Sequence, residues 1–64
     1  MYLDTKRMRV MRAEKDLSQD NVAKAAHISQ NHYSAIERGC RTPRIEVLDA
    51  IAQALGCNYK ELLM

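Results

Sequence analysis

Side chains that begin helices recur at short intervals along this chain, and they restrict it to a set of short helices. Small polar side chains accept hydrogen bonds from the free N–H groups of a first helical turn, and proline is favoured at the opening position. Glycine supplies the left-handed backbone at which many helices end. The start signals are Asp4, Ser18, Ser29, Thr42-Pro43 and Asn58, and the stop signals are Gly39 and Gly56. This pattern predicts five short helices.

The apolar spacing sets the range of each predicted helix. The first helix follows Asp4 and ends near residues 15–16, the second spans residues 19–26, and the third spans residues 30–38. The fourth carries an inward apolar stripe and ends at Gly56, and the fifth follows a capping box at Asn58. Helices this short are marginal on their own, so mutual packing must hold them. The stripe consists of Ile45, Leu48, Ile51, Ala52 and Leu55.

The composition favours helices and excludes several classes of protein. The chain has 64 residues, of which 47% are hydrophobic, yet it has no Phe or Trp and only two Gly and one Pro. Leu, Ile, Val, Met and Ala must form the core, which suits helices better than strands. An all-β sandwich is excluded, and so is an enzyme with a deep pocket, because too little chain remains to build its walls. No nucleophile–base pair, metal cluster or phosphate loop is recognisable, so we expect no catalysis and no cofactor.

Charge is divided unevenly along the chain. The formal net charge is +2, but residues 1–44 carry nine basic and five acidic side chains, a balance of +4. Residues 45–64 carry one basic and three acidic side chains, a balance of −2. A basic front and an acidic back indicate a polyanionic partner on one side. A solvated surface with uneven charges is the alternative at this point.

The cysteines and the N-terminal residues indicate a cytoplasmic protein without a membrane segment. Cys40 and Cys57 form no CxxC pair, so we expect reduced thiols. Together with His27 and His32 they match no familiar zinc spacing, and no metal site is predicted. No apolar run approaches the roughly 20 residues that span a bilayer. The first seven residues lack the apolar stretch of a signal peptide.

Residues 18–38 have the features of two short helices joined by a tight turn. Ala23 is the small residue that a close helix crossing needs, while Tyr33 and Ile36 supply the inner face of the second helix. Amide and hydroxyl groups discriminate the edges of DNA bases, and Lys and Arg neutralise phosphates. A plain solvated helix surface is the simpler alternative. The outer face carries uncharged hydrogen-bonding groups between basic flanks, namely Gln30, Asn31, His32 and Ser34.

At these residues the chain resembles the XRE family of helix-turn-helix regulators, the Cro and phage-repressor type. The resemblance runs from about residue 8 to residue 63, which is nearly the whole chain. Each motif is weak alone, but together, in order and at the family's spacing, they are specific. The motifs are Arg12, Leu17-Ser18-Gln19, Val22-Ala23, Ile36-Glu37-Arg38-Gly39, Pro43 and Ala54-Leu55-Gly56.

Three positions depart from the family's pattern. His27 stands where glycine is usual in the turn, and Asp16 stands where Gly or Asn usually ends the first helix. Both positions require a left-handed backbone, which Asp and His tolerate better than β-branched residues do. We therefore expect a cost in stability and the same fold. Tyr33 is larger than the aliphatic residue usual at its position, which leaves the packing beneath the recognition helix open.

The resemblance implies a single all-α domain over residues 1–64, a compact five-helix lambda-repressor-like fold whose helix-turn-helix spans residues 18–38. It also implies that Arg12 and Glu37 pair across the first and third helices. The implied function is sequence-specific binding of double-stranded DNA by a transcriptional regulator. The alternative is an antitoxin, or another protein-interaction module on the same fold, which usually needs further chain to cover its partner.

The predicted site falls into three groups of residues. Base edges are read by Gln30, Asn31, His32 and Ser34, and phosphates are met by Gln19, Arg12, Arg38, Arg41 and Arg44. A homodimer on a palindromic operator doubles the readout of one helix. The acidic C-terminal end faces away from the basic front and is the expected self-contact, through Tyr59, Leu63 and Met64.

Overall fold

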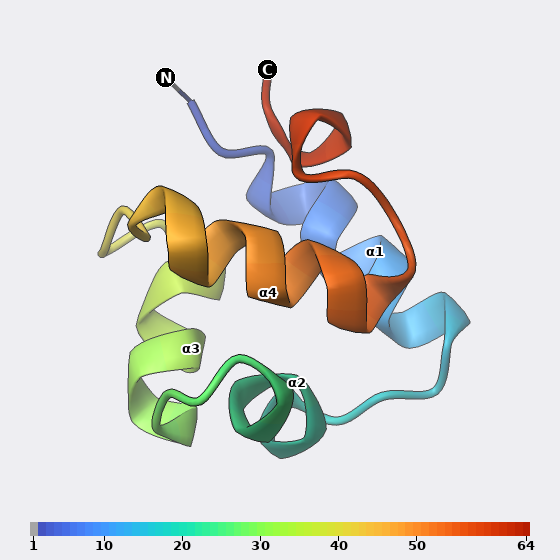
Figure 1. Ribbon diagram of the computed structural model, residues 1–64, viewed down its shortest axis with the longest axis vertical. Helices are drawn as coiled ribbons and strands as arrows, with labels where there is room; N and C mark the ends of the chain where they lie inside the picture. The colour runs from blue at the N-terminus through green and yellow to red at the C-terminus, as the bar shows by residue number, and fades with distance from the viewer. Residues whose placement is uncertain (1) are drawn as a thin grey trace.

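The computed structural model describes residues 2–64, and its helices begin and end close to the predicted positions (Figure 1). Among these residues four α-helices follow one another, and a short 3-10 helix, η1, comes last. No helix in this part of the chain is long and apolar enough to cross a membrane. The bounds are α1 Thr5–Glu14, α2 Gln19–Ala25, α3 Gln30–Glu37, α4 Ile45–Leu55 and η1 Tyr59–Leu62.

The predicted side-chain caps begin α1, α2, α3 and η1. The prediction that Pro43 opens the fourth helix is wrong, because α4 begins at Ile45, after Arg44, which makes no side-chain cap hydrogen bond. The Ser29 hydroxyl accepts a hydrogen bond from the backbone N–H of His32 at 3.0 Å, at the start of α3. The Ser18 hydroxyl accepts from the backbone N–H of Asn21 at 3.0 Å, and the Asn21 side chain accepts from the Ser18 N–H in return. Each cap satisfies donors that the first turn of a helix leaves free. Local sequence therefore fixes where the two helices of the motif begin.

The prediction of five α-helices is wrong at the last element. The capping box at Asn58 forms, because the Glu61 side chain accepts a hydrogen bond from the Asn58 backbone N–H at 2.9 Å. Only the four residues of η1 follow, in 3-10 geometry. Leu63 then returns to extended backbone and pairs with Leu3 in an isolated antiparallel bridge. Too few residues lie between the cap and this pairing for an α-helix to form.

The left-handed positions predicted from the sequence are confirmed. Asp16, after α1, has a φ angle of 54°, and His27, after α2, has a φ angle of 59°. Gly39 and Gly56 also have positive φ angles, 77° and 75°. A side chain with a Cβ atom is strained in this region, whereas glycine is not. Two of the four left-handed turns of the described chain therefore carry conformational strain.

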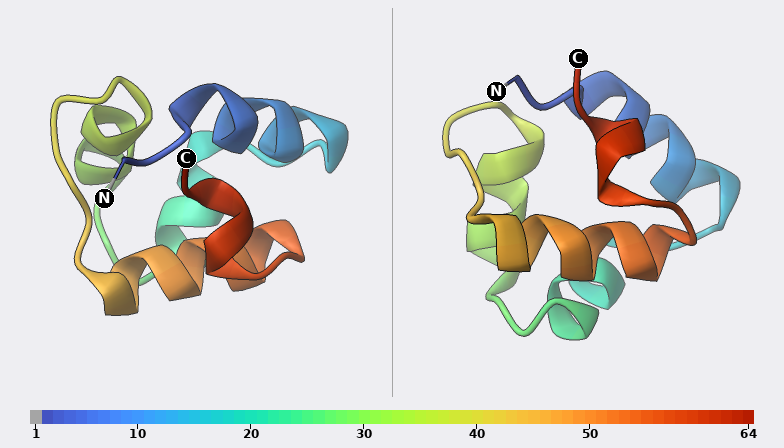
Figure 2. Two further views of the ribbon diagram at one scale, coloured as in Figure 1. Left: turned by 90° about the horizontal axis from the view of Figure 1, so that it is seen from above. Right: turned by 45° about the horizontal axis from the view of Figure 1, so that its top comes forward.

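The core lies between α4 and the other helices, and α4 packs against α2 and η1 (Figures 1 and 2). Tyr33 and Ile36 of α3 are fully buried, as the inner face of the motif requires. Ile45 was predicted in the inward stripe but is 44% exposed, because the buried stripe begins one turn later, at Leu48. The buried apolar residues are Met8, Val22, Ala23, Ala26, Tyr33, Ile36, Leu48, Ile51, Ala52, Leu55 and Leu62.

The N-terminal and C-terminal segments lie side by side (Figures 1 and 2). The backbone N–H of Asp4 donates to the carbonyl of Leu62 at 2.7 Å. The N–H of Met64 donates to the carbonyl of Tyr2 at 2.9 Å. These two bonds flank the bridge between Leu3 and Leu63 and join α1 to η1.

Candidate nucleic-acid interface

The second helix of the motif, α3, presents a polar face to solvent. Gln30 and Asn31, in its first turn, are exposed, and Ser34, one turn on, is half-buried. His32 is also half-buried. All four predicted base-reading residues thus lie on α3 with side chains that are at least partly accessible.

Ala35 was not predicted as part of this face. It is half-buried and follows Asn31 by four residues, so the two side chains lie on the same side of α3. The four-residue spacing between Asn31 and Ala35 was the sequence signal that could have placed Ala35 on this face. A methyl group at such a position can contact the methyl group of thymine.

The opposite side of α3 is held by a buried carboxylate. Glu37 is only 2% exposed, at the C-terminal end of α3. Its Oε2 accepts a hydrogen bond from Arg12 Nε at 2.6 Å, and its Oε1 accepts from Arg12 Nη2 at 3.3 Å. The predicted pairing of Arg12 with Glu37 across α1 and α3 is therefore confirmed, and it is bidentate, the geometry that arginine favours with carboxylates.

The charges of this pair support each other. The hydrogen bond with Glu37 raises the pKa of Arg12 above its ordinary value, against the effect of burial. Burial alone would raise the pKa of Glu37, but hydrogen bonds from Arg12 and Gln19 outweigh it, so this pKa lies below its ordinary value. Both groups stay charged near neutral pH, and the pair fixes α3 against α1.

Two residues that were predicted to bind phosphates, Gln19 and Arg12, also donate hydrogen bonds inside the protein. The Gln19 amide donates from Nε2 to Glu37 Oε1 at 2.9 Å. The Arg12 guanidinium also donates from Nη1 to the carbonyl of Leu17 at 2.9 Å. Three of the five N–H donors of Arg12 therefore have partners inside the protein.

Arg9 adds a contact that sequence reasoning missed. Its Nη1 donates to the backbone carbonyl of Glu37 at 2.7 Å, at a helix end where carbonyls lack partners along the helix. Arg9 precedes Arg12 by three residues, so both lie on one side of α1. That spacing was the only signal in the sequence. Two arginines of α1 thus hold the same residue, one by its carboxylate and one by its carbonyl.

The remaining predicted phosphate-binding residues lie beyond the end of α3. Arg38, Arg41 and Arg44 are all exposed. Arg38 Nε donates to the carbonyl of Ser34 at 3.4 Å. No ion pair with an acidic side chain of residues 2–64 holds any of the three. The basic flank therefore remains available to an anion.

The predicted self-contact residues lie near the paired ends of the chain. Met64 is 77% exposed, while Tyr59 and Leu63 are half-buried. Tyr2, which was not predicted, is 76% exposed and accepts the hydrogen bond from Met64 described above.

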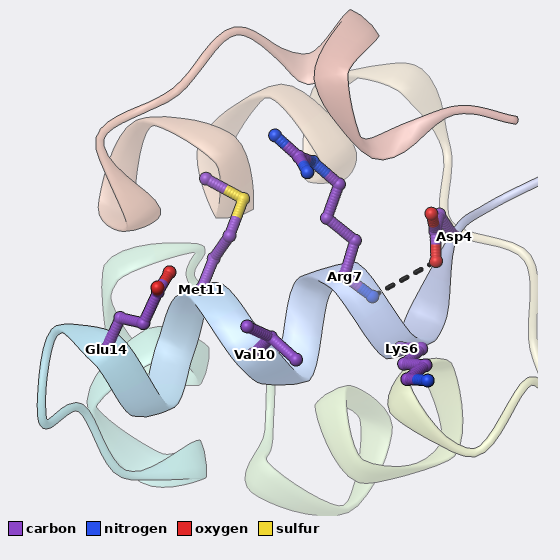
Figure 3. Close-up of a pocket in the computed structure, with 6 residues that line it drawn as sticks. All are labelled: Asp4, Lys6, Arg7, Val10, Met11 and Glu14. Atoms are coloured by element: carbon purple, nitrogen blue, oxygen red, sulfur yellow. Dashed lines mark hydrogen bonds between the residues drawn. The ribbon is translucent and has the colours of Figure 1, made fainter.

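A hollow of about 380 Å³ runs along the outer side of α1 (Figure 3). None of the predicted site residues lines it. Among residues 2–64, no cluster of His, Cys, Asp or Glu could hold a metal ion. The predicted chemistry thus gathers on α3 and its flanks, not in this hollow. The lining residues are Asp4, Lys6, Arg7, Val10, Met11 and Glu14.

Two short helices joined by a tight turn, with a polar outer face and a basic flank, define a helix-turn-helix domain of the repressor type. The chain belongs to the XRE-type helix-turn-helix family, whose pattern matches residues 8–62. Its relatives are named as transcription regulators and not as enzymes. The comparison confirms the family that the motifs indicated.

Curated relatives share a third or more of the matched residues. The chain is 42% identical over 53 residues to the HTH-type transcriptional regulator y4dJ of Sinorhizobium fredii, covering 83% of this chain and 69% of that protein. It is 33% identical over 57 residues to the phage CTXphi transcriptional repressor RstR of Vibrio cholerae, covering 89% of this chain. The match spans only 51% of that repressor's length.

Solved structures with this fold include one bound to DNA. The P22 c2 repressor in complex with a synthetic operator has a TM-score of 0.88 at 30% identity, covering 98% of this chain and 96% of that chain. The restriction-modification controller protein C.AhdI of Aeromonas hydrophila has a TM-score of 0.86 at 29% identity, covering 92% of this chain and 89% of that one. The likeness to both extends over nearly the whole chain.

Proposed function

We propose that this protein is a sequence-specific regulator of transcription that binds a palindromic operator as a homodimer and acts in the cytoplasm. One observation carries the proposal: α3 presents an exposed, uncharged polar face directly before an unpaired basic flank. The same fold in the P22 c2 repressor binds a synthetic operator. In a helix-turn-helix, the second helix enters the major groove with its N-terminal residues on the base edges.

Bases are read from the first turns of α3. Gln30 and Asn31 can each bind adenine through two hydrogen bonds, and a good pair of this kind contributes about 1–3 kcal/mol of discrimination. Ser34 and His32 add donors and acceptors along the same side. The Gln30, Asn31 and Ser34 side chains are uncharged, so their contribution depends on the base sequence more than on salt.

Phosphates are met by residues around this face. Arg38, Arg41 and Arg44 supply positive charge beyond the C-terminal end of α3. Gln19 and Arg12 have free N–H donors beside those that bind inside the protein. Phosphate contacts fix the position of the protein on the duplex, and the salt dependence of binding grows with the number of phosphates that are neutralised.

A second copy is required for sufficient specificity. One helix reads only a few base pairs, and a genome presents roughly 10⁶–10⁹ competing sites. Two copies of α3 about 34 Å apart, related by a two-fold axis, would read two half-sites on one side of the duplex. Tyr59, Leu63 and Met64 form the contact between the copies in this proposal.

The first experiment selects bound sequences from a random DNA pool with the purified protein. Variants are then bound to operators with single base changes at several salt concentrations. Gln30→Ala and Asn31→Ala should weaken discrimination at particular base pairs and leave the salt slope nearly unchanged. Arg41→Ala and Arg44→Ala should weaken binding to all sequences alike and reduce the salt slope by about one for each phosphate that is no longer neutralised.

Lys15→Ala is the matched control for the loss of one positive charge, because Lys15 is exposed at the end of α1 and belongs neither to the proposed DNA interface nor to the proposed contact between the copies. It should change neither base preference nor salt slope appreciably. The assignment of the two groups would be wrong if the arginine variants altered base preference and the Gln30 and Asn31 variants did not.

Sedimentation of the DNA complex tests the dimer. Two protomers on a palindromic site are expected, and Met64→Asp should reduce the affinity for the full site but not for a half-site. A stable, specific complex of one protomer with the full site would contradict the homodimer.

A further inference from the structure

The hydroxyl of Tyr33 is a buried polar group without a partner. Tyr33 is fully buried in α3, and its hydroxyl oxygen makes no hydrogen bond with any residue among 2–64. No other buried polar side-chain atom of the described chain lacks a partner. Burying a hydroxyl without a hydrogen bond costs free energy, so such a group suggests a role in another state of the protein.

The unpaired hydroxyl lies beside the carboxylate that holds α3. Tyr33 and Glu37 are four residues apart and both buried, so they lie on the same side of the helix. Burial raises the pKa of Tyr33, and so does the approach of its hydroxyl to the Glu37 carboxylate, an approach that falls short of hydrogen-bond geometry in the free protein. The phenol therefore keeps its proton and is a potential donor next to an anion.

The Glu37 carboxylate already has its donors in the free protein. Arg12 occupies Oε2 at 2.6 Å, while Oε1 accepts from Gln19 at 2.9 Å and more weakly from Arg12 at 3.3 Å. Gln19 is thus the main donor to Oε1. The proposed function gives the Gln19 amide a second acceptor, a DNA phosphate.

We propose that Tyr33 replaces Gln19 as the donor to Glu37 when the Gln19 side chain turns to a phosphate. The inference rests on the proposed function, because it needs Gln19 at the phosphate backbone. The exchange keeps the buried carboxylate fully hydrogen-bonded in both states. It makes Tyr33 a positioning residue, since the hydroxyl touches no DNA and acts through Glu37 and Gln19.

The exchange predicts crossed effects in a double-mutant cycle of Tyr33→Phe and Gln19→Ala. With Gln19 present, Tyr33→Phe should weaken operator binding about tenfold, because binding then leaves a charged acceptor short of one hydrogen bond. With Gln19→Ala, the hydroxyl already serves Glu37 in the free protein. Adding Tyr33→Phe should then leave operator affinity unchanged from that of Gln19→Ala alone.

Thermal unfolding without DNA should show the opposite pattern. With Gln19 present, Tyr33→Phe removes only an unpaired hydroxyl and should leave the melting temperature unchanged or slightly raised. In the Gln19→Ala protein the same change should lower the melting temperature by about 5 °C, because it removes the replacement donor. Tyr2→Phe is the control, since this tyrosine is 76% exposed and should change nothing in either background.

The two measurements separate this inference from the proposed function. Equal effects of Tyr33→Phe in both backgrounds, on binding and on melting, would overturn the exchange while the protein still bound its operator. Failure of the unmodified protein to bind any DNA would overturn the proposed function and the DNA-driven step. The melting data would still decide whether the hydroxyl can replace the amide.

Discussion

The two ends of α3 and the buried side of α4 are held by different physical means. At the C-terminal end of α3, Glu37 receives hydrogen bonds from Arg9 and Arg12 of α1. Along α4, Leu48, Ile51 and Leu55 are fully buried among apolar neighbours. The N-terminal end of α3 begins at its Ser29 cap, and its first two residues, Gln30 and Asn31, are exposed to solvent.

This comparison indicates that the apolar packing of α4 sets the stability of the fold, whereas the polar contacts at Glu37 set the orientation of α3. Apolar burial is strong but has no direction, so it holds α4 in place without fixing fine angles. Hydrogen bonds to a charged group depend on direction and distance, and a buried pair adds little net stability. The contacts at Glu37 therefore set the angle at which α3 meets a partner.

Breaking the polar junction should have the largest effect. Arg12→Ala leaves the Glu37 carboxylate buried without its main partner, and the free energy of unfolding should fall by about 4 kcal/mol. Arg7→Ala is the control, because Arg7 meets Glu61 at 3.9 Å with both side chains half exposed, and it should cost at most about 1 kcal/mol. Urea unfolding of the two variants measures both values. A double-mutant cycle of Arg12 and Glu37 without coupling would contradict the junction.

Shortening the apolar side of α4 should cost somewhat less and should spare orientation. Leu48→Ala removes a fully buried side chain and should lower the free energy of unfolding by about 3 kcal/mol. The base preference of the folded fraction should remain, because the Glu37 contacts are untouched. Arg12→Lys keeps the positive charge but cannot form the bidentate hydrogen bonds to Glu37, so it should change base preference more than stability. If Leu48→Ala altered base preference while Arg12→Lys mainly lowered stability, the assignment of stability to α4 and of orientation to the Glu37 contacts would be refuted.

Acid should weaken the polar junction selectively. The pKa of Glu37 in the folded protein lies below its ordinary value, so its contribution to stability is fully present above about pH 4.5. That contribution is lost as the pH falls through the folded-state pKa. Glu37→Gln should therefore flatten the fall in stability between about pH 5 and 3, measured by urea unfolding. Glu46→Gln, at an exposed residue of α4, should leave the slope nearly unchanged.

The smallest effect should come from the turns that end helices. His27→Gly removes the strain of a side chain in a left-handed backbone and should raise the free energy of unfolding by about 0.5–1 kcal/mol. The net gain should be smaller, because glycine also increases the conformational entropy of the unfolded chain. Asp16→Gly should act in the same direction. Thermal melting measures both changes. A clear loss of stability in His27→Gly would show that the imidazole makes stabilising contacts in the fold.

Local signals in the sequence predicted most of the fold. Ser18, Ser29 and Gly56 fix helix ends through their own side chains or backbone, which is why four helix ranges came within one or two residues. The 3-10 form of the last element depended on the distant pairing of Leu3 with Leu63, which no local pattern encodes.

The site was predictable to a similar extent. The pair of Arg12 with Glu37 followed from the family resemblance. The contacts of Arg9 and Gln19 with Glu37 did not, because each needs the crossing angle of helices far apart in the sequence. Which residues read bases and which meet phosphates stays a prediction.

The backbone bonds of Tyr2 with Met64 and of Asp4 with Leu62 hold the two ends of the chain together. The helices could therefore pack in the same way if they were connected in a different order. A short flexible linker could join residue 64 to residue 2, and new ends could open in the exposed loop at residues 39–42. Such a circular permutant would begin with α4 and finish with α3, with every helix and the turn between α2 and α3 still whole. Helix α3 would then be the last helix of the chain, so that a label or a second domain could be fused directly after it.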